Sequence, residues 1–316
     1  MKILVTPTSF KKSQNDKARE ILESFADEII YNPYGRPLES FDVCELIGDC
    51  DGYIAGLDYI DENAIEKASK LRVISRYGAG VDRVDLEMAK KKNIIVTNTP
   101  GTNAVAVCEL AFGLMLALAR SIPRLNNAVI NGEWPRNNGI ELKGKTLSIL
   151  GLGAIGKNLA IRAKAFGMKI CTYDPFVDEK YANQNDIEIC TFSESIESAD
   201  FISLHMPLLP SIKHCINKKT ISSMKNGVYI VNTARGGLID ENAAYEGLKS
   251  GKIAGLALDA YETEPVAESP LLKLDNVIST PHTGAHTNEA IAGMGMMAVE
   301  NLIAELKSKD SNHRVG

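Results

Sequence analysis

Short apolar runs alternate with helix-length segments along the whole 316-residue chain, and this alternation limits the fold more than any other feature. The first series of predicted strands covers residues 2–6, 53–55, 72–75 and 94–97. Predicted helices lie among them at residues 11–26, 61–70 and 85–91. Strands that alternate with helices are typical of parallel sheets covered by helices on both faces.

A second series of strands follows a long segment, residues 103–130, that we predict to be one helix. These strands are almost continuously apolar, as parallel strands buried on both faces are. They cover residues 146–150, 169–173, 201–204, 228–231 and 253–258. A last helix is predicted at residues 288–307. We therefore expect an α/β fold of two doubly wound parallel-sheet lobes around a cleft.

Charge and hydropathy exclude several classes of protein. The chain has 35 Lys and Arg against 40 Asp and Glu, a formal net charge of −5, whereas proteins that grip nucleic acid are generally basic. The longest apolar run, residues 110–119, is about half of what a membrane-spanning helix needs. Pro7 breaks the N-terminal segment too early for a signal peptide. We expect a cytoplasmic protein that binds neither nucleic acid nor membrane.

The six cysteines include no Cys-x-x-Cys pair. A disulfide framework is not expected in a chain of this size without a secretory signal. We predict that all six are free and act as small buried apolar side chains. His282 and His286 have the spacing of a helical metal-binding pair, but Pro281 and Gly284 indicate a loop, so no metal site is expected.

A glycine motif follows the predicted strand at 146–150. Its residues are Gly151, Leu152, Gly153, Ala154, Ile155 and Gly156. Such a motif alone is a weak signal, but here a strand precedes it, a helix pattern follows it, and Asp174 ends the next strand. The pattern favours a dinucleotide site over an empty tight turn, with the pyrophosphate at the helix N-terminus. Asp174 would bind the ribose hydroxyls and repel a 2′-phosphate, so we expect NAD rather than NADP.

Ordered blocks along nearly the whole chain resemble the D-isomer-specific 2-hydroxyacid dehydrogenases, most closely the phosphoglycerate dehydrogenases among them. The blocks read YGAGVD, NTPG, GLGAIG, HMPL, NTARGG, LDAYETEP and TPHTG. The resemblance implies a flavodoxin-like substrate-binding lobe at 1–98 and 287–316, with a Rossmann NAD-binding lobe at 99–286 inserted between. It also implies reversible, NAD-dependent oxidation of a D-2-hydroxy acid to the 2-keto acid.

Three side chains in these blocks form the predicted catalytic set. Imidazole titrates near working pH, so His282 is the candidate acid–base group. By resemblance, Glu264 hydrogen-bonds the other ring nitrogen of His282, and Arg235 binds the substrate carboxylate and polarises the 2-oxygen. Taken singly, these residues would be interpreted as a loop histidine, a turn acid and a surface ion-pair partner. Their joint occurrence in family blocks favours catalysis.

The resemblance implies further contacts. Asp259 would contact the nicotinamide carboxamide or ribose, and His205 would be structural or close to the cofactor. The other predicted cofactor contacts are Met206, Pro207, Thr233, Ala234, Arg235, His282 and Gly284. The backbone N–H groups around Gly78, Ala79 and Gly80 can meet the substrate carboxylate. A glycine-rich turn without a ligand is the alternative there.

The predicted substrate is 3-phosphoglycerate, oxidised to 3-phosphohydroxypyruvate in serine biosynthesis. Arg76 and Arg136 match positions that are basic in phosphoglycerate dehydrogenases, and Arg36 would add a charge or be a solvated surface residue. By resemblance, Arg136 reaches the partner's site in a homodimer built on the 103–130 helix and the nucleotide lobe. Asp58 opposes this choice, because it lies just after the third strand, where many relatives carry a phosphate-binding arginine.

Two alternatives remain at this stage. One is a glyoxylate or hydroxypyruvate reductase, or a reductase for another D-2-hydroxyacid. The other belongs to a different class, the NAD(H)-sensing corepressor-like binding proteins of the same fold, which can retain the catalytic residues. The regulatory domain that some relatives append is expected to be absent.

Overall fold

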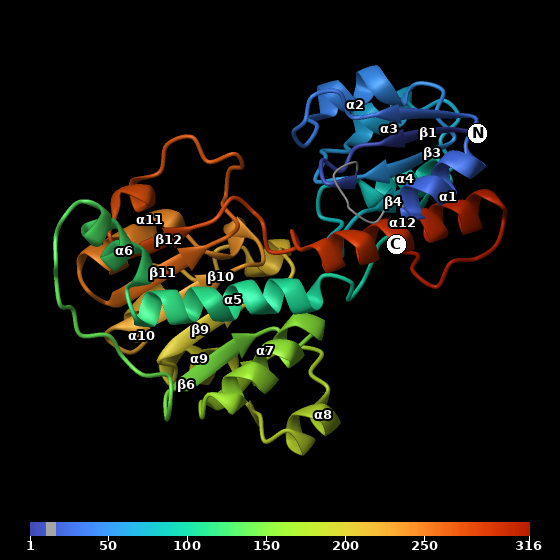
Figure 1. The fold of residues 1–316 in the computed structure, drawn as a ribbon. Coiled ribbons are helices and arrows are strands. Elements are labelled where there is room, and N and C mark those ends of the chain that lie inside the picture. The colour runs from blue at the N-terminus through green and yellow to red at the C-terminus, as the bar shows by residue number, and fades with distance from the viewer. Residues whose placement is uncertain (11–16) are drawn as a thin grey trace. The chain divides into compact units, whose positions relative to one another are not determined.

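The computed structural model describes residues 1–10 and 17–316, which form two compact units (Figure 1). One unit comprises residues 1–103 and 285–316, and the other comprises residues 104–284. The predicted boundaries at 98/99 and 286/287 differ from these by a few residues. Residues 99–103 stay with the first unit, where they are hydrogen-bonded. Thr99 N–H, for example, donates to the Gly78 carbonyl at 3.1 Å.

The first unit contains a parallel sheet in the order β2-β1-β3-β4-β5, which is the flavodoxin-like order. Its strands are β1 (Lys2–Val5), β2 (Glu28–Tyr31), β3 (Gly52–Ala55), β4 (Val73–Arg76) and β5 (Ile95–Thr97). Its helices are α1 (Lys17–Phe25), α2 (Ser40–Ile47), α3 (Glu62–Lys67), α4 (Leu86–Lys91) and α12 (Asn288–Leu306). Residues 11–16 of the predicted 11–26 helix lie outside the described residues.

The central strands of this sheet are buried because helices cover them. Leu4, Tyr53 and Ile74 belong to one apolar cluster with residues of α2, α3 and α4. Helix α12 packs against β3, β4 and β5, and α1 packs on α12. The last segment of the chain therefore completes the unit that the first segment begins.

The second unit contains a seven-stranded parallel sheet in the order β12-β11-β10-β9-β6-β7-β8. Its strands are β6 (Thr146–Leu150), β7 (Lys169–Tyr173), β8 (Glu188–Ile189), β9 (Phe201–Leu204), β10 (Val228–Asn232), β11 (Ile253–Leu258) and β12 (Val277–Ser279). Counted from β6, this is the Rossmann order with one added strand, and its switch point lies between β6 and β9. Both sheets are parallel and doubly wound, so the predicted fold class is confirmed.

The helices of the second unit alternate with these strands. They are α5 (Ala104–Ala119), α6 (Ile122–Ile130), α7 (Ala154–Ala165), α8 (Glu179–Gln184), α9 (Phe192–Glu197), α10 (Lys218–Ser223) and α11 (Glu241–Lys249). The prediction of one helix over 103–130 is wrong, because α5 and α6 meet at a 62° bend. Ser121 adopts a left-handed conformation there, with φ 50°. Pro123 follows in the first turn of α6, where its ring cannot continue a helix from α5.

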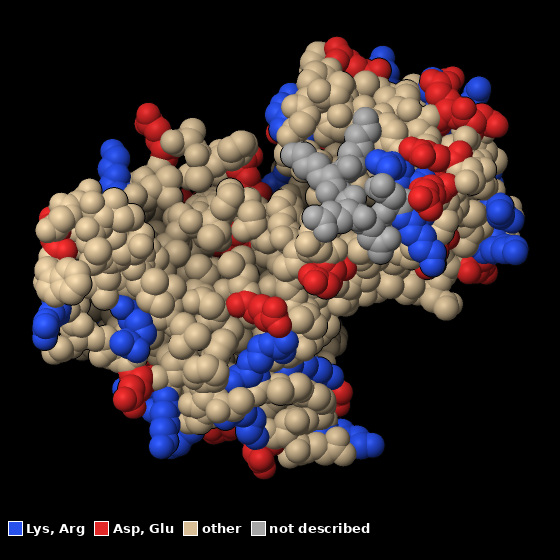
Figure 2. Space-filling view, in the orientation of Figure 1, with Lys and Arg blue, Asp and Glu red and all other residues tan. Residues whose placement is uncertain are grey.

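Charges of both signs are interspersed on the face of the molecule drawn in Figure 2. Among the described residues, no single helix is long and apolar enough to cross a membrane. Helices α5 and α6 meet that measure only when they are counted together despite their bend.

Candidate active site

The glycine motif forms the turn between β6 and α7 at the switch point of the second sheet. Gly151 has φ +101°, and a Cβ there would lie 2.8 Å from the His205 carbonyl oxygen. A Cβ on Gly156 would lie 2.2 Å from the Gly151 carbonyl oxygen. Gly153, which precedes α7, has no neighbouring atom within 4 Å of its Cβ position. The first and last glycines thus close the turn, and the middle one leaves room for a pyrophosphate at the helix N-terminus.

Asp174 lies just beyond the carboxyl end of β7, beside this turn. Its Oδ2 accepts a hydrogen bond from Leu152 N–H at 2.8 Å, and its Oδ1 accepts one from Phe176 N–H at 2.8 Å. Both bonds hold the carboxylate next to the glycine motif. This is the position that the sequence assigned to a ribose-binding acid, and its role as a ligand to ribose stays a prediction.

Two buried polar atoms near the ends of β9 and β10 lack protein partners within the described residues. They are His205 Nδ1 and Thr233 Oγ1. His205 Nε2 lies 2.8 Å from Ser203 Oγ, and burial lowers the pKa of His205 to about 4, so its ring is neutral at physiological pH. Unpaired buried polar atoms are costly unless a ligand or water meets them. Their position at strand ends next to the glycine turn fits a bound dinucleotide.

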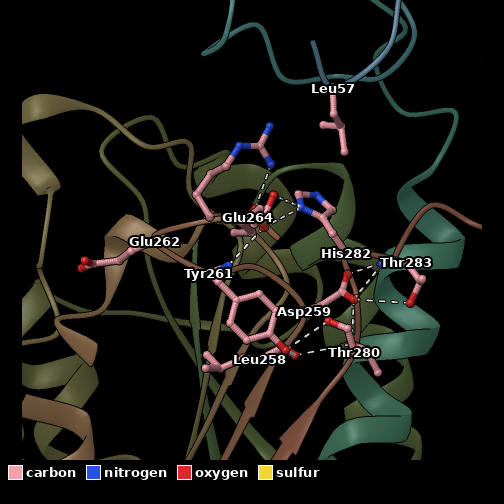
Figure 3. A network of polar contacts seen from close by, with 12 residues as sticks. Leu57, Leu258, Asp259, Tyr261, Glu262, Glu264, Thr280, His282 and Thr283 are labelled. Carbon is pink, nitrogen blue, oxygen red and sulfur yellow. Dashed lines mark hydrogen bonds and ion pairs between the residues drawn. The ribbon is translucent and has the colours of Figure 1, made fainter. Parts of the chain in front are cut away.

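His282 and Glu264 form a close pair at the end of the same sheet (Figure 3). His282 Nδ1 lies 2.9 Å from Glu264 Oε1 and 3.0 Å from Oε2. The side chains are 25% and 16% exposed, so water reaches the pair only partly. Because Nδ1 faces a carboxylate, it carries the ring proton, which leaves Nε2 of neutral His282 able to accept one.

Asp259 holds the loop that carries His282. This carboxylate, which is 1% exposed, accepts hydrogen bonds from Thr280 Oγ1 at 2.6 Å, Thr283 N–H at 2.8 Å and Gly284 N–H at 2.8 Å. His282 itself has φ +52°, a region in which residues other than glycine are uncommon. The bonds of Asp259 on both sides of His282 fix this conformation. The structure therefore gives Asp259 a role in the protein itself, and its predicted nicotinamide contact stays a prediction.

Arg235 follows β10 and lies one residue before an unusually close backbone contact. Its Nη1 donates to the Ala234 carbonyl at 2.8 Å, and its own carbonyl accepts from Asn232 Nδ2 at 2.8 Å. A Cβ on the next residue, Gly236, would lie 1.8 Å from the carbonyl carbon of Tyr261. Tyr261 N–H in turn donates to Glu264 Oε1 at 3.1 Å. The segments that carry Arg235 and Glu264 are thus packed backbone against backbone.

Met206, Pro207, Thr233 and Ala234 follow β9 and β10 and lie in the second unit with the glycine motif, as do Ala154 and Ile155 at the start of α7. The second unit therefore contains all of the predicted cofactor-binding residues and the three predicted catalytic residues. Sequence reasoning missed Thr280, Thr283, Tyr261 and Gly236, which hold this site through hydrogen bonds and close packing. Only the Gly-Gly pair at 236–237 carried a signal, as a close approach of backbones.

The predicted carboxylate-binding loop, residues 78–80, follows β4 in the first unit. Gly78 N–H donates to Thr99 Oγ1 at 2.9 Å, and the role of this loop in binding the substrate carboxylate stays a prediction. Among the described residues, neither Ala79 N–H nor Gly80 N–H donates to a protein acceptor. Arg76 is 5% exposed and donates to the carbonyls of Ala55 and Tyr77. Its guanidinium lies beneath the loop, 3.3 Å from the Cβ position of Gly78.

Two charged residues weighed for the substrate have other partners. Arg36 forms a two-pronged pair with Asp42, at 2.7 and 3.0 Å, so its charge is neutralised. Asp58 is 1% exposed and accepts from Leu38 N–H and Gly56 N–H, both at 2.8 Å. Thr6 and Tyr53 hydroxyls also donate to it. Asp58 thus points into its own unit, where it organises the loop after β3 rather than repelling an anion.

Arg136 is exposed in the segment between α6 and β6. Among the residues that the structure describes, no three His, Cys, Asp or Glu side chains are grouped to hold a metal ion. All six cysteines are free, as predicted. Only Cys50, Cys108 and Cys171 are buried, whereas Cys44, Cys190 and Cys215 are half-buried.

Comparisons with known proteins agree with this geometry. Residues 112–284 match the model of the D-isomer specific 2-hydroxyacid dehydrogenase, NAD binding domain. The chain is 49% identical over 253 residues to D-3-phosphoglycerate dehydrogenase of Methanocaldococcus jannaschii, covering 79% of this chain and 48% of the relative. It is 44% identical over 275 residues to hydroxypyruvate reductase of Thermotoga maritima, covering 85% and 89%. It thus spans about half the length of the first of these relatives.

Among solved structures, D-lactate dehydrogenase of Aquifex aeolicus, complexed with NAD and lactic acid, has a TM-score of 0.86 and 29% sequence identity. The match covers 99% of this chain and 98% of that one.

Proposed function

The chain belongs to the D-isomer-specific 2-hydroxyacid dehydrogenase family, and from that premise we propose that it oxidises a D-2-hydroxy acid reversibly to the 2-keto acid with NAD. The observation that carries the proposal is the His282–Glu264 pair, whose Nδ1–carboxylate contacts of 2.9 and 3.0 Å leave Nε2 as the proton acceptor. A histidine in this state, held by an acid, is the arrangement that general-base catalysis requires.

The residues of this chain divide the work as follows. His282 Nε2 takes the proton of the substrate hydroxyl, and Glu264 stabilises the imidazolium that results. Arg235 pairs with the substrate carboxylate and polarises the 2-oxygen. When NAD is bound, its nicotinamide supplies the two-electron acceptor for the hydrogen on carbon 2. In the reverse direction His282 returns the proton to the 2-oxygen.

The residues that would hold NAD are those of the second unit. The turn at Gly151–Gly156 would accept the pyrophosphate, and Asp174 the ribose hydroxyls. The unpaired atoms of His205 and Thr233 fit the same site. Asp174 carries a negative charge where NADP has its 2′-phosphate, which favours NAD.

For the substrate we propose 3-phosphoglycerate, oxidised in serine biosynthesis. The identity of 49% to a D-3-phosphoglycerate dehydrogenase supports it. Arg76 beneath the 78–80 loop and Arg136 on the exposed segment would supply the charges. Hydroxypyruvate reduction is the second candidate. It is favoured by the loop after β3, which presents no cation and buries Asp58, by the pairing of Arg36 with Asp42, and by the reductase relative.

We also propose that the protein acts in the cytoplasm as a homodimer. Helix α5, whose apolar run suggested the dimer, is largely buried within its own unit and gives little support. Better support comes from α6 and the segment after it, where Ile130 and Trp134 are 73% and 78% exposed. Exposed large apolar side chains that lie near each other in the chain are consistent with an interface.

One substrate panel tests the function. The purified protein is mixed with NAD and 3-phosphoglycerate, and separately with NADH and hydroxypyruvate, glyoxylate or pyruvate, while NADH absorbance is followed. We expect turnover, with the highest kcat/KM for the phosphorylated acid. Binding of NADH without turnover of any acid would instead favour the corepressor-like alternative.

A further inference from the structure

We propose that the C-terminal tail, residues 309–316, positions the 78–80 loop through Asn301 and Asn98, and thereby sets the affinity for the 2-hydroxy acid. This inference rests on the proposed function, which assigns that loop to the substrate carboxylate. Each residue of the argument lies in the first unit.

The tail is attached to the open edge of the sheet beside β5. Thr97 and Arg314 form an antiparallel bridge. Val315 N–H donates to the Val96 carbonyl at 2.8 Å, and Asn98 N–H donates to the His313 carbonyl at 3.1 Å. A second anchor is Glu305 of α12, which is 2% exposed and accepts from Arg314 Nε at 2.8 Å. The tail is therefore a built part of the unit, and Figure 1 marks its end beside α12.

A series of hydrogen bonds made by the side chains of one histidine and two asparagines connects the tail to the loop. His313 Nδ1 lies 3.0 Å from Asn301 Oδ1, and Asn301 Nδ2 donates to the Asn98 carbonyl at 2.9 Å. Asn98 Nδ2 then donates to the Ala79 carbonyl at 2.8 Å. Because Asn301 Oδ1 can only accept, His313 must hold its proton on Nδ1. Asn301 is 4% exposed, so both ends of its amide depend on these partners.

Because the peptide bond is planar, hydrogen bonds to the carbonyls of this loop also fix the directions of two of its N–H groups. In a trans peptide, the carbonyl of one residue and the N–H of the next point in opposite directions. The Gly78 carbonyl accepts from Thr99 N–H at 3.1 Å, which fixes the direction of Ala79 N–H. The Ala79 carbonyl accepts from Asn98, which fixes the direction of Gly80 N–H. These are the two N–H groups of the loop that have no acceptor among the described residues.

Asn98 is thus a positioning residue, since it acts on a substrate carboxylate only through the Ala79–Gly80 peptide. Ala79 is itself exposed, so the loop has little packing to hold it there. Without the Asn98 bond the peptide is free to rotate, and the Gly80 N–H spends less time in the binding direction. The acid then binds more weakly, whereas the proton and hydride steps in the second unit keep their residues.

The experiment compares four variants with the wild type. Asn98→Asp keeps the backbone bonds of residue 98 but replaces the donor toward Ala79 with an acceptor. His313→Ala removes the start of this series of hydrogen bonds, and His313→Asn keeps an N–H near the position of Nδ1. Asn63→Ala is the matched control, because Asn63 is an exposed asparagine of the same unit whose side chain donates to Asp61, away from the 78–80 loop. Melting temperatures identify any variant that fails to fold. If Asn98→Asp or His313→Ala fails in this way, the other of the two variants tests the proposal.

We expect Asn98→Asp and His313→Ala to raise the KM for the acid roughly 3- to 10-fold, which is the effect of one hydrogen bond. Their kcat and NADH dissociation constant should stay within about twofold of wild type, as one lost loop contact leaves the second unit intact. His313→Asn and Asn63→Ala should keep the wild-type KM. Hydrogen exchange of the peptide that covers residues 77–81 should be faster in Asn98→Asp and His313→Ala alone.

Wild-type KM and wild-type exchange in both variants would overturn the proposal. A fall in kcat that accompanies the rise in KM would also overturn it, as would a raised KM in His313→Asn. Either result indicates a general loss of structure in the protein rather than a change at the loop. A wild-type protein that turns over no acid would defeat the proposed function instead. In that case the exchange of residues 77–81 still decides whether the tail holds the loop.

Discussion

Gly236 and Tyr261 touch through their backbones, with the Gly236 Cβ position 1.8 Å from the Tyr261 carbonyl carbon. No side chain fits at residue 236 unless one of the two segments moves. Because Arg235 precedes this contact and Glu264 bonds Tyr261 N–H, a single contact sets the spacing of two side chains that we propose to be catalytic.

Gly236→Ala should therefore lower kcat/KM by roughly 10²-fold, as displacements of about 1 Å in an active site do. NADH binding should fall less, because the turn at Gly151–Gly156 and Asp174 do not depend on this contact, although the predicted cofactor contacts at Thr233 and Ala234 precede it in the chain. Steady-state kinetics and a fluorescence titration with NADH measure the two effects. Gly251→Ala strains a turn residue with φ +75° but meets no neighbouring atom, so it is the control for a general loss of stability.

His282→Ala should reduce turnover by roughly 10²- to 10⁴-fold while NADH binding persists, because only the proton acceptor is removed. Glu264→Gln should change the pH dependence of kcat/KM, since the imidazolium loses its charged partner. The matched control is His286→Ala, four residues along the chain. Wild-type turnover in His282→Ala would exclude this histidine from the mechanism.

Asp174→Ala should relax the discrimination against NADP, because the carboxylate that repels its 2′-phosphate is gone. The ratio of kcat/KM for NAD and NADP is the quantity to measure. Asp186→Ala, which removes an exposed acid of the same unit that pairs with Lys164, should leave the ratio unchanged. A wild-type preference for NADP would contradict the assignment of Asp174.

The stability of the first unit should depend on pH through Glu305. The hydrogen-bonded Arg314 guanidinium holds the pKa of Glu305 below its usual value, against the effect of burial. A carboxyl group with a lowered pKa contributes stability above its unfolded pKa of about 4.3 and loses it as pH falls through the folded value. The Glu305→Gln variant should thus be less stable than the wild type at neutral pH. It should also lose less stability than the wild type when the pH is lowered. Thermal unfolding between neutral and acidic pH tests this, with the exposed Glu300→Gln as control.

Arg136→Ala should weaken 3-phosphoglycerate binding more than glyoxylate binding, because only the former carries a phosphate. Arg124→Ala, an exposed arginine of α6, is the control. Equal losses for both acids would exclude a phosphate contact at Arg136. Light scattering on the same samples reports whether the protein is a dimer, and a monomer at working concentration would contradict the proposed assembly.

The sheet class could be predicted from the sequence, and the candidate residues of the second unit could be named, because both depend on local patterns. Continuous apolar strands and the turn at Gly151–Gly156 are visible in short windows. The break at Ser121 was missed because the apolar run of α5 outweighed Pro123, although proline is a helix-stopping signal. Strand β2 and helix α2 were missed because their apolar patterns are short and half-exposed.

The roles of Asp58, Arg36 and Asp259 could not be obtained from the sequence in the same way. Whether Arg36 can bind a substrate anion depends on Asp42, which lies six residues along the chain and pairs with its guanidinium. The environment of Asp58 is made by Thr6 and Leu38, which are distant in the chain. Pairings of this kind are set by tertiary structure, which a pattern of residue types does not record.

Helix α6 has no buried residue in its own unit, although much of its sequence is apolar. No residue of α6 belongs to the two apolar clusters of its unit, so substitutions at its exposed positions leave the interior packing untouched. In the proposed homodimer, α6 is the place where an engineer can change how the two copies recognise each other while both sheets stay as they are.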